Sequence, residues 1–390
     1  MFRKQQRTAH GQCSHAVSVG TAGAAPCLFG ESASLRQFIP LLDDAGLLVR
    51  ATEPVHWRFA IGRMTREVRK PLLFENIIGY PGQRVFTNGL SGNACLALAL
   101  GMDLNSTRSA IPGELRRRLS SPLVPRTIEI PGVPEDLAEA RDPDLTRLPI
   151  PHWSELDGGR YLGTWHINVS KDPETGARNA GVYRMQLLDG RHATVNALPG
   201  SHLAMHVDKA ERYNRPLRMG VAIGVPEAVV VAAAAGCPAG KDEFELAGML
   251  LQRPVELIRC PGVDLEVPAA SEIVATGIIH PRVRVQDGPF FDYMGVPNTN
   301  PEAFLFEVTR LWVRNEPIFR GASVGTPGAE DHQLFSLVAE LGLLDFHGSR
   351  FRRHVQNMLF RRGMFRALQQ TSRAARVLRL LARAKGTDSL

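Results

Sequence analysis

The chain has 390 residues, of which 44% are hydrophobic and 22% are charged, with a formal net charge of +7. These values exclude a mainly disordered chain, a collagen and a coiled-coil rod, and the length suits two or three globular domains. No apolar run approaches the roughly 18 residues that a membrane-spanning helix needs. The five cysteines are scattered without a C-x-x-C pair, so we expect no disulfide framework and a cytoplasmic location.

The positive charge is concentrated near the C-terminus. Residues 350–385 hold eleven Lys and Arg and no acid, which leaves a formal charge of −4 on the rest of the chain. We therefore expect no nucleic-acid partner. Apolar residues recur at helical spacing in this basic segment, so it predicts an amphipathic helix. Such a helix contacts a membrane surface, binds a partner, packs on its own chain or is left over from a truncated gene.

The first part of the chain predicts an arm and a small α/β domain. Residues 1–30 are rich in Ala, Gly and Ser and lack a secretory apolar core, so we expect a disordered arm. Residues 31–120 predict the N-terminal α/β domain. Its expected elements are a helix between Ser34 and Gly46, strands at 47–49, 71–74 and 85–87, and a helix at 94–100.

The next segments predict a linker and a strand-rich domain. Residues 121–159 are rich in Pro, which opposes regular helix or central strand, so we expect an extended linker. Residues 160–325 alternate strand patterns with turn residues and predict a β-barrel-like domain. Its expected strands are 161–170, 181–188, 193–198, 217–223, 255–259 and 283–285, and its helices are 201–213, capped by Ser201, and 226–235. Residues 326–390 form the expected helical tail.

Four polar residues stand out in the strand-rich region. Asn179 and Arg184 lie at the two ends of one expected extended run, His202 opens a helix, and Glu243 follows a loop. An Asn oxygen, a His nitrogen and a Glu oxygen together suit Mn²⁺ or Mg²⁺. Spacing alone does not bring them together. The alternative is a turn Asn, a polar residue at a helix start and a solvated acid.

Asp287 and Asp292 bracket a Gly-Pro turn. A turn can bring two carboxylates near one point, where an Arg holds one ionised and the other exchanges a proton. The alternative is a surface loop with solvated acids.

Several ordered blocks make the chain resemble the UbiD family of decarboxylases, from about Leu35 to about Asp331. The blocks are residues 72–76, 172–176, 178–184, 267–274 and 287–290, with Pro317-Ile318 and Glu330-Asp331. The resemblance implies a mixed α/β (α+β) fold with a central split β-barrel that is similar to flavin reductases. It implies prenylated flavin mononucleotide (FMN) as cofactor, Mn²⁺ or Mg²⁺ as metal, and K⁺ as an optional second cation. It also implies a C-terminal domain, most of which this chain lacks.

The resemblance assigns roles residue by residue. Asn179, His202 and Glu243 match the metal ligands that hold the flavin phosphate. The further cofactor contacts that it implies are Thr164, Val182, Tyr183 and Arg184. Arg184, Asp287 and Asp292 match the catalytic trio, in which Arg184 orients the substrate carboxylate, Asp287 tunes the network and Asp292 delivers the proton. Asp287 replaces the usual Glu and Phe291 replaces a Gly, so we expect strain if that position needs φ above zero.

The implied activity is reversible decarboxylation of α,β-unsaturated or aromatic acids. Implied partners are the acid substrate, a flavin prenyltransferase that supplies the cofactor, and either a second copy of the chain or a second subunit. Two alternatives stay open. One is a non-catalytic or partner-dependent flavin-binding subunit, and the other is a membrane-surface or scaffold protein built on a degenerate fold of this family.

Overall fold

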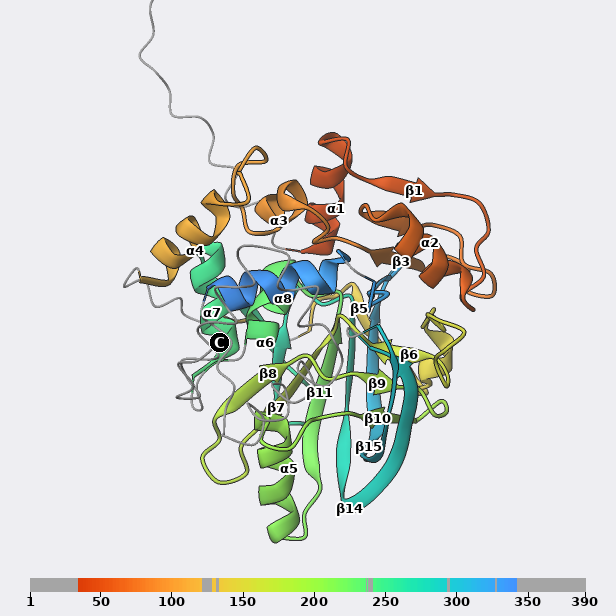
Figure 1. The fold of residues 1–390 in the computed structure, drawn as a ribbon. Helices are drawn as coiled ribbons and strands as arrows, with labels where there is room; N and C mark the ends of the chain where they lie inside the picture. Colours follow the sequence, from red (N-terminus) through yellow and green to blue (C-terminus); the bar gives the residue numbers. More distant parts are fainter. Residues whose placement is uncertain are drawn as a thin grey trace, which may run out of the picture.

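The computed structural model describes residues 34–120, 128–130, 133–235, 237, 241–292, 295–326 and 328–341 (Figure 1). The expected arm at residues 1–30 and the expected basic helix at residues 350–385 lie outside these residues.

A four-stranded sheet has the order β1-β2-β3-β16, and its strands β1 and β3 lie beside the N-terminal helices in the upper part of Figure 1. Its strands are β1 (Val49–Ala51), β2 (Leu72–Phe74), β3 (Arg84–Thr87) and β16 (Ile318–Arg320). Only β2 and β3 pair antiparallel. Because β16 comes from the far end of the described chain, the chain returns to this sheet after it has built the central region.

The N-terminal helices follow the predicted pattern in part. They are α1 (Leu35–Asp44), α2 (Ala60–Val68), α3 (Asn93–Ala99) and α4 (Ala110–Ser120). Ser34 caps α1 by accepting from the backbone N of Gln37, and Gly46 follows the helix end, as expected, with φ +66°. The predicted strands at 71–74 and 85–87 are confirmed, and the first strand lies two residues later than expected. α2 and α4 were not predicted from the sequence.

A seven-stranded sheet forms the lower part of Figure 1, in the order β10-β15-β14-β11-β7-β8 with β5 beside β15. Its strands are β5 (Leu137–Glu139), β7 (Ile167–Lys171), β8 (Arg178–Gly181), β10 (His192–Val195), β11 (Leu217–Ile223), β14 (Ile273–Phe291) and β15 (Pro297–Arg314). The predicted mixed α/β class is confirmed. The described strands do not close into a barrel, so the predicted split barrel is not confirmed.

Part of the expected linker contributes strands. β4 (Ile128–Ile130) pairs in parallel with β12 (Glu256–Arg259), which also pairs with β13 (Glu266–Pro268). β5 pairs with β15, and a 3-10 helix follows at Leu145–Arg147. A final pair joins β6 (Tyr161–Gly163) to β9 (Met185–Gln186). The Pro-rich segment is therefore partly ordered at the edges of two sheets.

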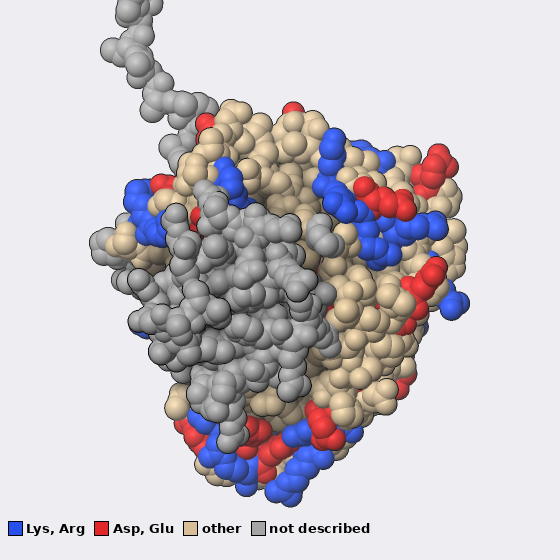
Figure 2. Space-filling model, in the orientation of Figure 1, with Lys and Arg blue, Asp and Glu red and all other residues tan. Residues whose placement is uncertain are grey.

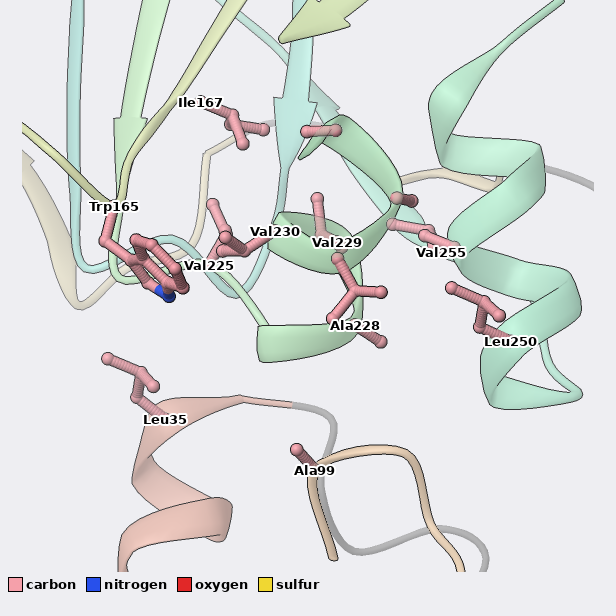
Figure 3. Packing of buried hydrophobic residues seen from close by; sticks show 14 of the residues in the cluster. Leu35, Ala99, Trp165, Ile167, Val225, Ala228, Val229, Val230, Leu250 and Val255 are labelled. Carbon is pink, nitrogen blue, oxygen red and sulfur yellow. The ribbon is translucent and has the colours of Figure 1, made fainter. Parts of the chain in front are cut away.

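The remaining helices are α5 (His202–Arg212), α6 (Glu227–Ala235), α7 (Glu243–Leu251) and α8 (Glu330–Glu340). α6 is almost entirely buried and packs against α7 and α8. Figure 3 shows that Leu35 of α1, Ala99 of α3, Ile167 of β7 and Leu250 of α7 surround it. One hydrophobic core therefore joins the N-terminal helices to the central sheet. None of the described helices is long and apolar enough to cross a bilayer.

A buried ionic network reinforces this junction. Arg320 of β16 donates from Nε to Glu227 of α6 and from Nη2 to Glu330 of α8, at 2.6 Å in both cases. All three residues are at most 2% exposed. Burial raises the pKa of Glu227, and the adjacent guanidinium opposes that shift. Removal of one partner from such a network destabilises a protein by roughly 3–5 kcal/mol.

The surface is mixed in charge. On the face shown in Figure 2, Lys and Arg lie beside Asp and Glu. Ion pairs such as Arg50 with Asp43 and Arg284 with Glu211 connect them.

Candidate active site

The predicted metal-type cluster consists of Asn179, His202 and Glu243, and the structure brings the three together. Asn179 lies in β8, while His202 and Glu243 are the first residues of α5 and α7. His202 Nδ1 lies 3.8 Å from Glu243 Oε1, and Glu243 Oε2 accepts a 2.9 Å hydrogen bond from the backbone N of Ala180. Asn179 and Glu243 are only 3% and 2% exposed. The alternative of a turn Asn and a solvated Glu is therefore wrong.

Two helix N-termini meet at the metal-type cluster. Ser201 caps α5 by accepting from the backbone N of Ala204, as predicted, and Asp242 caps α7 by accepting from Phe244. Helix N-termini carry partial positive charge and exposed N–H groups, which favour an anion such as phosphate.

The side chains of the metal-type cluster include atoms that can bind a cation. The Nδ2 atom of Asn179 is a buried donor that has no hydrogen-bond partner among the described residues, so it suits an anion such as phosphate, and only the Oδ1 atom of Asn179 can bind a cation. An amide oxygen, an imidazole and a carboxylate are ligands that Mn²⁺ and Mg²⁺ accept. Across the described residues, no three His, Cys, Asp or Glu side chains come close enough to bind a metal. A cation at this place therefore depends on the amide of Asn179.

An ion-pair network around Arg178 links the elements that carry the metal-type cluster. Arg178, next to Asn179, donates from Nε to Asp242 Oδ2 at 3.1 Å and from Nη1 to Glu266 Oε2 at 2.9 Å. Asp242 is next to Glu243 and also caps α7. Arg178 thus ties the strand that carries one candidate ligand to the helix that carries another.

The second group, the acid cluster, consists of Arg184, Asp287 and Asp292. Arg184 Nε donates to Asp287 Oδ1 at 2.6 Å, and its Nη2 contacts the same oxygen. Thr194 of β10 donates to Asp287 Oδ2 at 2.6 Å. Burial raises the pKa of Asp287, and the guanidinium and the hydroxyl oppose that shift. Both oxygens of the fully buried Asp287 carboxyl therefore accept hydrogen bonds.

Asn298 connects the rest of the acid cluster. Its backbone O accepts from Arg184 Nη2 at 3.4 Å, and its Nδ2 donates to Asp292 Oδ2 at 3.2 Å. Asp292 is 9% exposed. Asn298 and Thr194 were not predicted as site residues from the sequence. The signal for Asn298 was the hairpin register, because it pairs with Phe290 across the β14–β15 turn.

Phe291 occupies its position without the expected strain. It is absent from the described non-glycine residues with positive φ, so the expectation of a strained turn is wrong. Its ring lies against Gly325, where an added Cβ would come within 2.9 Å of Phe291 Cε1. A glycine opposite therefore makes room for the larger side chain.

Residues 179–184 join the two clusters, but not as one extended run. β8 ends at Gly181 and β9 begins at Met185, because the backbone N of Tyr183 donates to the side chain of Asn168 at 3.2 Å. The phenol of Tyr183 accepts from the backbone N of Leu203, beside His202. Burial raises the pKa of Tyr183 to about 12. The break therefore places Tyr183 beside α5, one residue before Arg184.

The two remaining predicted cofactor contacts are Thr164 and Val182. Thr164 is buried, and its Oγ1 accepts from the backbone N of Ala322 at 2.9 Å. Val182 is half-buried and packs against the large hydrophobic core. Their contacts with a flavin stay predictions.

Comparisons with known proteins define the family. Residues 130–327 match the model of the 3-octaprenyl-4-hydroxybenzoate carboxy-lyase Rift-related domain, and residues 39–111 match the N-terminal domain of the same enzymes. The chain therefore belongs to the UbiD family, as its sequence blocks predicted.

Relatives with assigned names are decarboxylases. The chain is 32% identical to a pyrrole-2-carboxylic acid decarboxylase of Pseudomonas aeruginosa over 325 residues, which covers 80% of this chain and 65% of that protein. It is also 32% identical to a phenolic acid decarboxylase of Streptomyces sp., over 76% of this chain and 65% of the relative. The chain thus spans about 65% of the length of these curated relatives.

Solved structures agree on the fold. An evolved dimeric form of the UbiD-class enzyme HmfF from Pelotomaculum thermopropionicum, in complex with prFMN, superimposes with a TM-score of 0.71 at 33% identity, covering 80% of this chain and 72% of that one. The closed form of the Sedimentibacter hydroxybenzoicus vanillic acid decarboxylase gives a TM-score of 0.74 at 30% identity, covering 78% and 67%.

Proposed function

We propose that the protein is a decarboxylase of α,β-unsaturated or aromatic acids that uses prenylated FMN and a divalent metal. The observation that carries the proposal is the convergence of two clusters on residues 179–184. One is a cation-binding set at two helix N-termini, and the other is a buried Arg with two acids.

The metal-type cluster would hold the cofactor by its phosphate. Asn179, His202 and Glu243 would bind Mn²⁺ or Mg²⁺, which neutralises phosphate charge in a semi-buried site. The ligand types of the three side chains support the metal, and the two helix starts support the phosphate. We further propose cofactor contacts for Thr164, Val182, Tyr183 and Arg184, and K⁺ as an optional second cation.

When bound, prenylated FMN accepts the electrons that remain on the substrate when CO₂ leaves. Arg184 orients the substrate carboxylate through its guanidinium and holds Asp287 in place. Asp287 is bound on both oxygens, so it fixes Arg184 rather than moving itself. Asp292 delivers from its carboxyl the proton that replaces CO₂ on the substrate carbon. At high CO₂ the same steps run in reverse.

The names of the relatives motivate the substrate class. Pyrrole-2-carboxylic, phenolic and vanillic acids are all aromatic acids, which agrees with the class implied by the sequence blocks. We propose a flavin prenyltransferase as the cofactor supplier, self-association of the chain, and a cytoplasmic location.

The test uses the full chain co-expressed with a flavin prenyltransferase. The purified protein is examined for flavin absorbance, for bound Mn, and for CO₂ release from pyrrole-2-carboxylate, vanillate, 4-hydroxybenzoate and cinnamate. We expect flavin and metal in equal amounts and CO₂ release from at least one acid. A protein that binds neither flavin nor metal contradicts the proposal. Binding of both without turnover favours the alternative of a partner-dependent flavin-binding subunit.

A further inference from the structure

A third buried acid, Asp157, holds the loop that carries Asp287 and Asp292. It lies in the turn before β6 and is 6% exposed. Its Oδ2 accepts from the backbone N of Ser154 at 2.9 Å, and its Oδ1 accepts from the backbone N of Phe291 at 2.7 Å. Phe291 directly precedes Asp292 in the chain. One carboxyl group therefore fastens the turn to the residue next to the proposed proton donor.

The residue after Asp157 makes a second contact with the same loop. The backbone N of Gly158 donates to the backbone O of Pro289 at 2.6 Å. An added Cβ on Gly158 would lie 2.7 Å from the backbone O of Gly288, so only glycine permits this approach. Tyr161 also donates to Pro289 O, at 3.3 Å. The turn and the loop thus meet along residues 157–158 and 289–291.

The Asp157 carboxyl makes no ion pair with any described residue, which sets it apart from Asp287. The charged or titratable groups that face it are Arg66 of α2, Arg184 and Tyr161. His152 bonds to its backbone O rather than to its carboxyl. Burial raises the pKa of Asp157 to about 6, although two backbone N–H groups and two guanidinium groups oppose that shift. A group so costly to bury is expected to have a role beyond local packing.

We propose that Asp157 is a positioning residue that sets where Asp292 lies relative to Arg184. The inference rests on the proposed function, in which Asp292 delivers the proton. Asp292 directly follows Phe291, so the hydrogen bond from the backbone N of Phe291 to Asp157 Oδ1 fixes the backbone from which the Asp292 side chain extends. Because a shift of about 1 Å in a reacting group can lower a rate about a hundredfold, this anchor controls the proton-transfer step.

The test is Asp157→Asn in the full chain. An amide can accept from Phe291 N or from Ser154 N, but its NH₂ then faces the other donor, so one anchor is lost. We expect kcat for decarboxylation to fall about a hundredfold while KM changes by less than about threefold. We also expect the backbone N–H groups of Gly288 and residues 290–292 to exchange hydrogen about tenfold faster, with α5 unchanged as the control for folding. Glu155→Gln, an exposed acid in the same turn, should change neither quantity.

The outcomes separate this inference from the proposed function. Faster exchange with unchanged kcat makes Asp157 merely structural and overturns the inference, as does unchanged exchange in the variant. If the wild-type protein releases CO₂ from no acid, the proposed function fails. The exchange rates of residues 288–292 then decide alone whether Asp157 holds the loop.

Discussion

The metal-type cluster and the acid cluster are held in different ways. Asn179 lies in β8, and His202 and Glu243 begin two capped helices, while the ion pair of Arg178 with Asp242 ties β8 to the start of α7. In the acid cluster, Arg184 and Asp287 satisfy each other directly. Under the proposed function, the first cluster requires a bound cation, whereas the second contains its own ion pair between Arg184 and Asp287. Substitutions should therefore affect ligand binding in the first and stability and turnover in the second.

The largest effect is expected from Arg184→Met. It leaves Asp287 buried without its cation, so we expect unfolding to require about 3 kcal/mol less free energy. The loss of carboxylate orientation should lower kcat/KM about a thousandfold. Urea unfolding and CO₂ release measure the two effects.

A paired variant checks the physical reason. Arg184→Met with Asp287→Asn removes the uncompensated charge, so it should recover most of the stability and none of the activity. The exposed Arg191, paired with Asp142, is the matched control, and Arg191→Met should change stability by less than about 0.5 kcal/mol. Equal losses in both Arg variants would contradict the account.

The pH dependence of stability should report Asp157. Its folded-state pKa of about 6 exceeds the ordinary 3.8, so the folded state binds more protons between these values. Stability from this group is therefore present below about pH 4 and is lost as the pH rises through about 6, by about 3 kcal/mol. In Asp157→Asn that decline should be absent, as measured by urea unfolding at pH 4 to 7. Glu155→Gln should keep the wild-type slope, and parallel curves for wild type and Asp157→Asn would contradict the assignment.

Glu243→Gln should separate binding from stability. The amide can still accept from Ala180 N, so we expect little change in unfolding free energy. Loss of the anionic ligand should weaken Mn²⁺-dependent FMN binding about a hundredfold. A fluorescence titration of FMN, with Mn²⁺ or with EDTA, measures this. Glu245→Gln, on the same helix, is the control, and equal FMN affinity in all three proteins would remove Glu243 from the site.

The smallest effect should come from Arg178→Met. It breaks the link between β8 and the start of α7, so we expect about a tenfold loss of Mn²⁺-dependent FMN affinity. Lys171 forms an ion pair with Glu266 but with neither Asn179 of β8 nor Glu243 of α7. Lys171→Met is therefore the matched control. If the two variants weaken FMN binding alike, the effect of Arg178 is one of charge rather than position.

Local patterns predicted much of the fold. β11 has the bounds that the sequence indicated, α5 begins after Ser201, and β10 overlaps the strand expected at 193–198. Each of these depends on residues close together in the chain. The return of β16 to the N-terminal sheet and the long hairpin of β14 and β15 depend on distant pairings, so spacing alone could not reveal them.

The site, like the fold, was predicted from the sequence only in part. The family resemblance predicted six site residues, which the structure places in two clusters. They are Asn179, His202, Glu243, Arg184, Asp287 and Asp292. The break before Arg184 was missed because a side chain, Asn168, replaces a backbone partner there. Asp157 was missed because its contact, Phe291, is 134 residues away.

Crystals grown with FMN and MnCl₂ give the most direct test of the central claim. The anomalous difference map at the manganese edge should show one peak bonded to Asn179, His202 and Glu243 and to the FMN phosphate, with the flavin ring facing Arg184. FMN bound elsewhere, or no peak between these three side chains, would contradict the account.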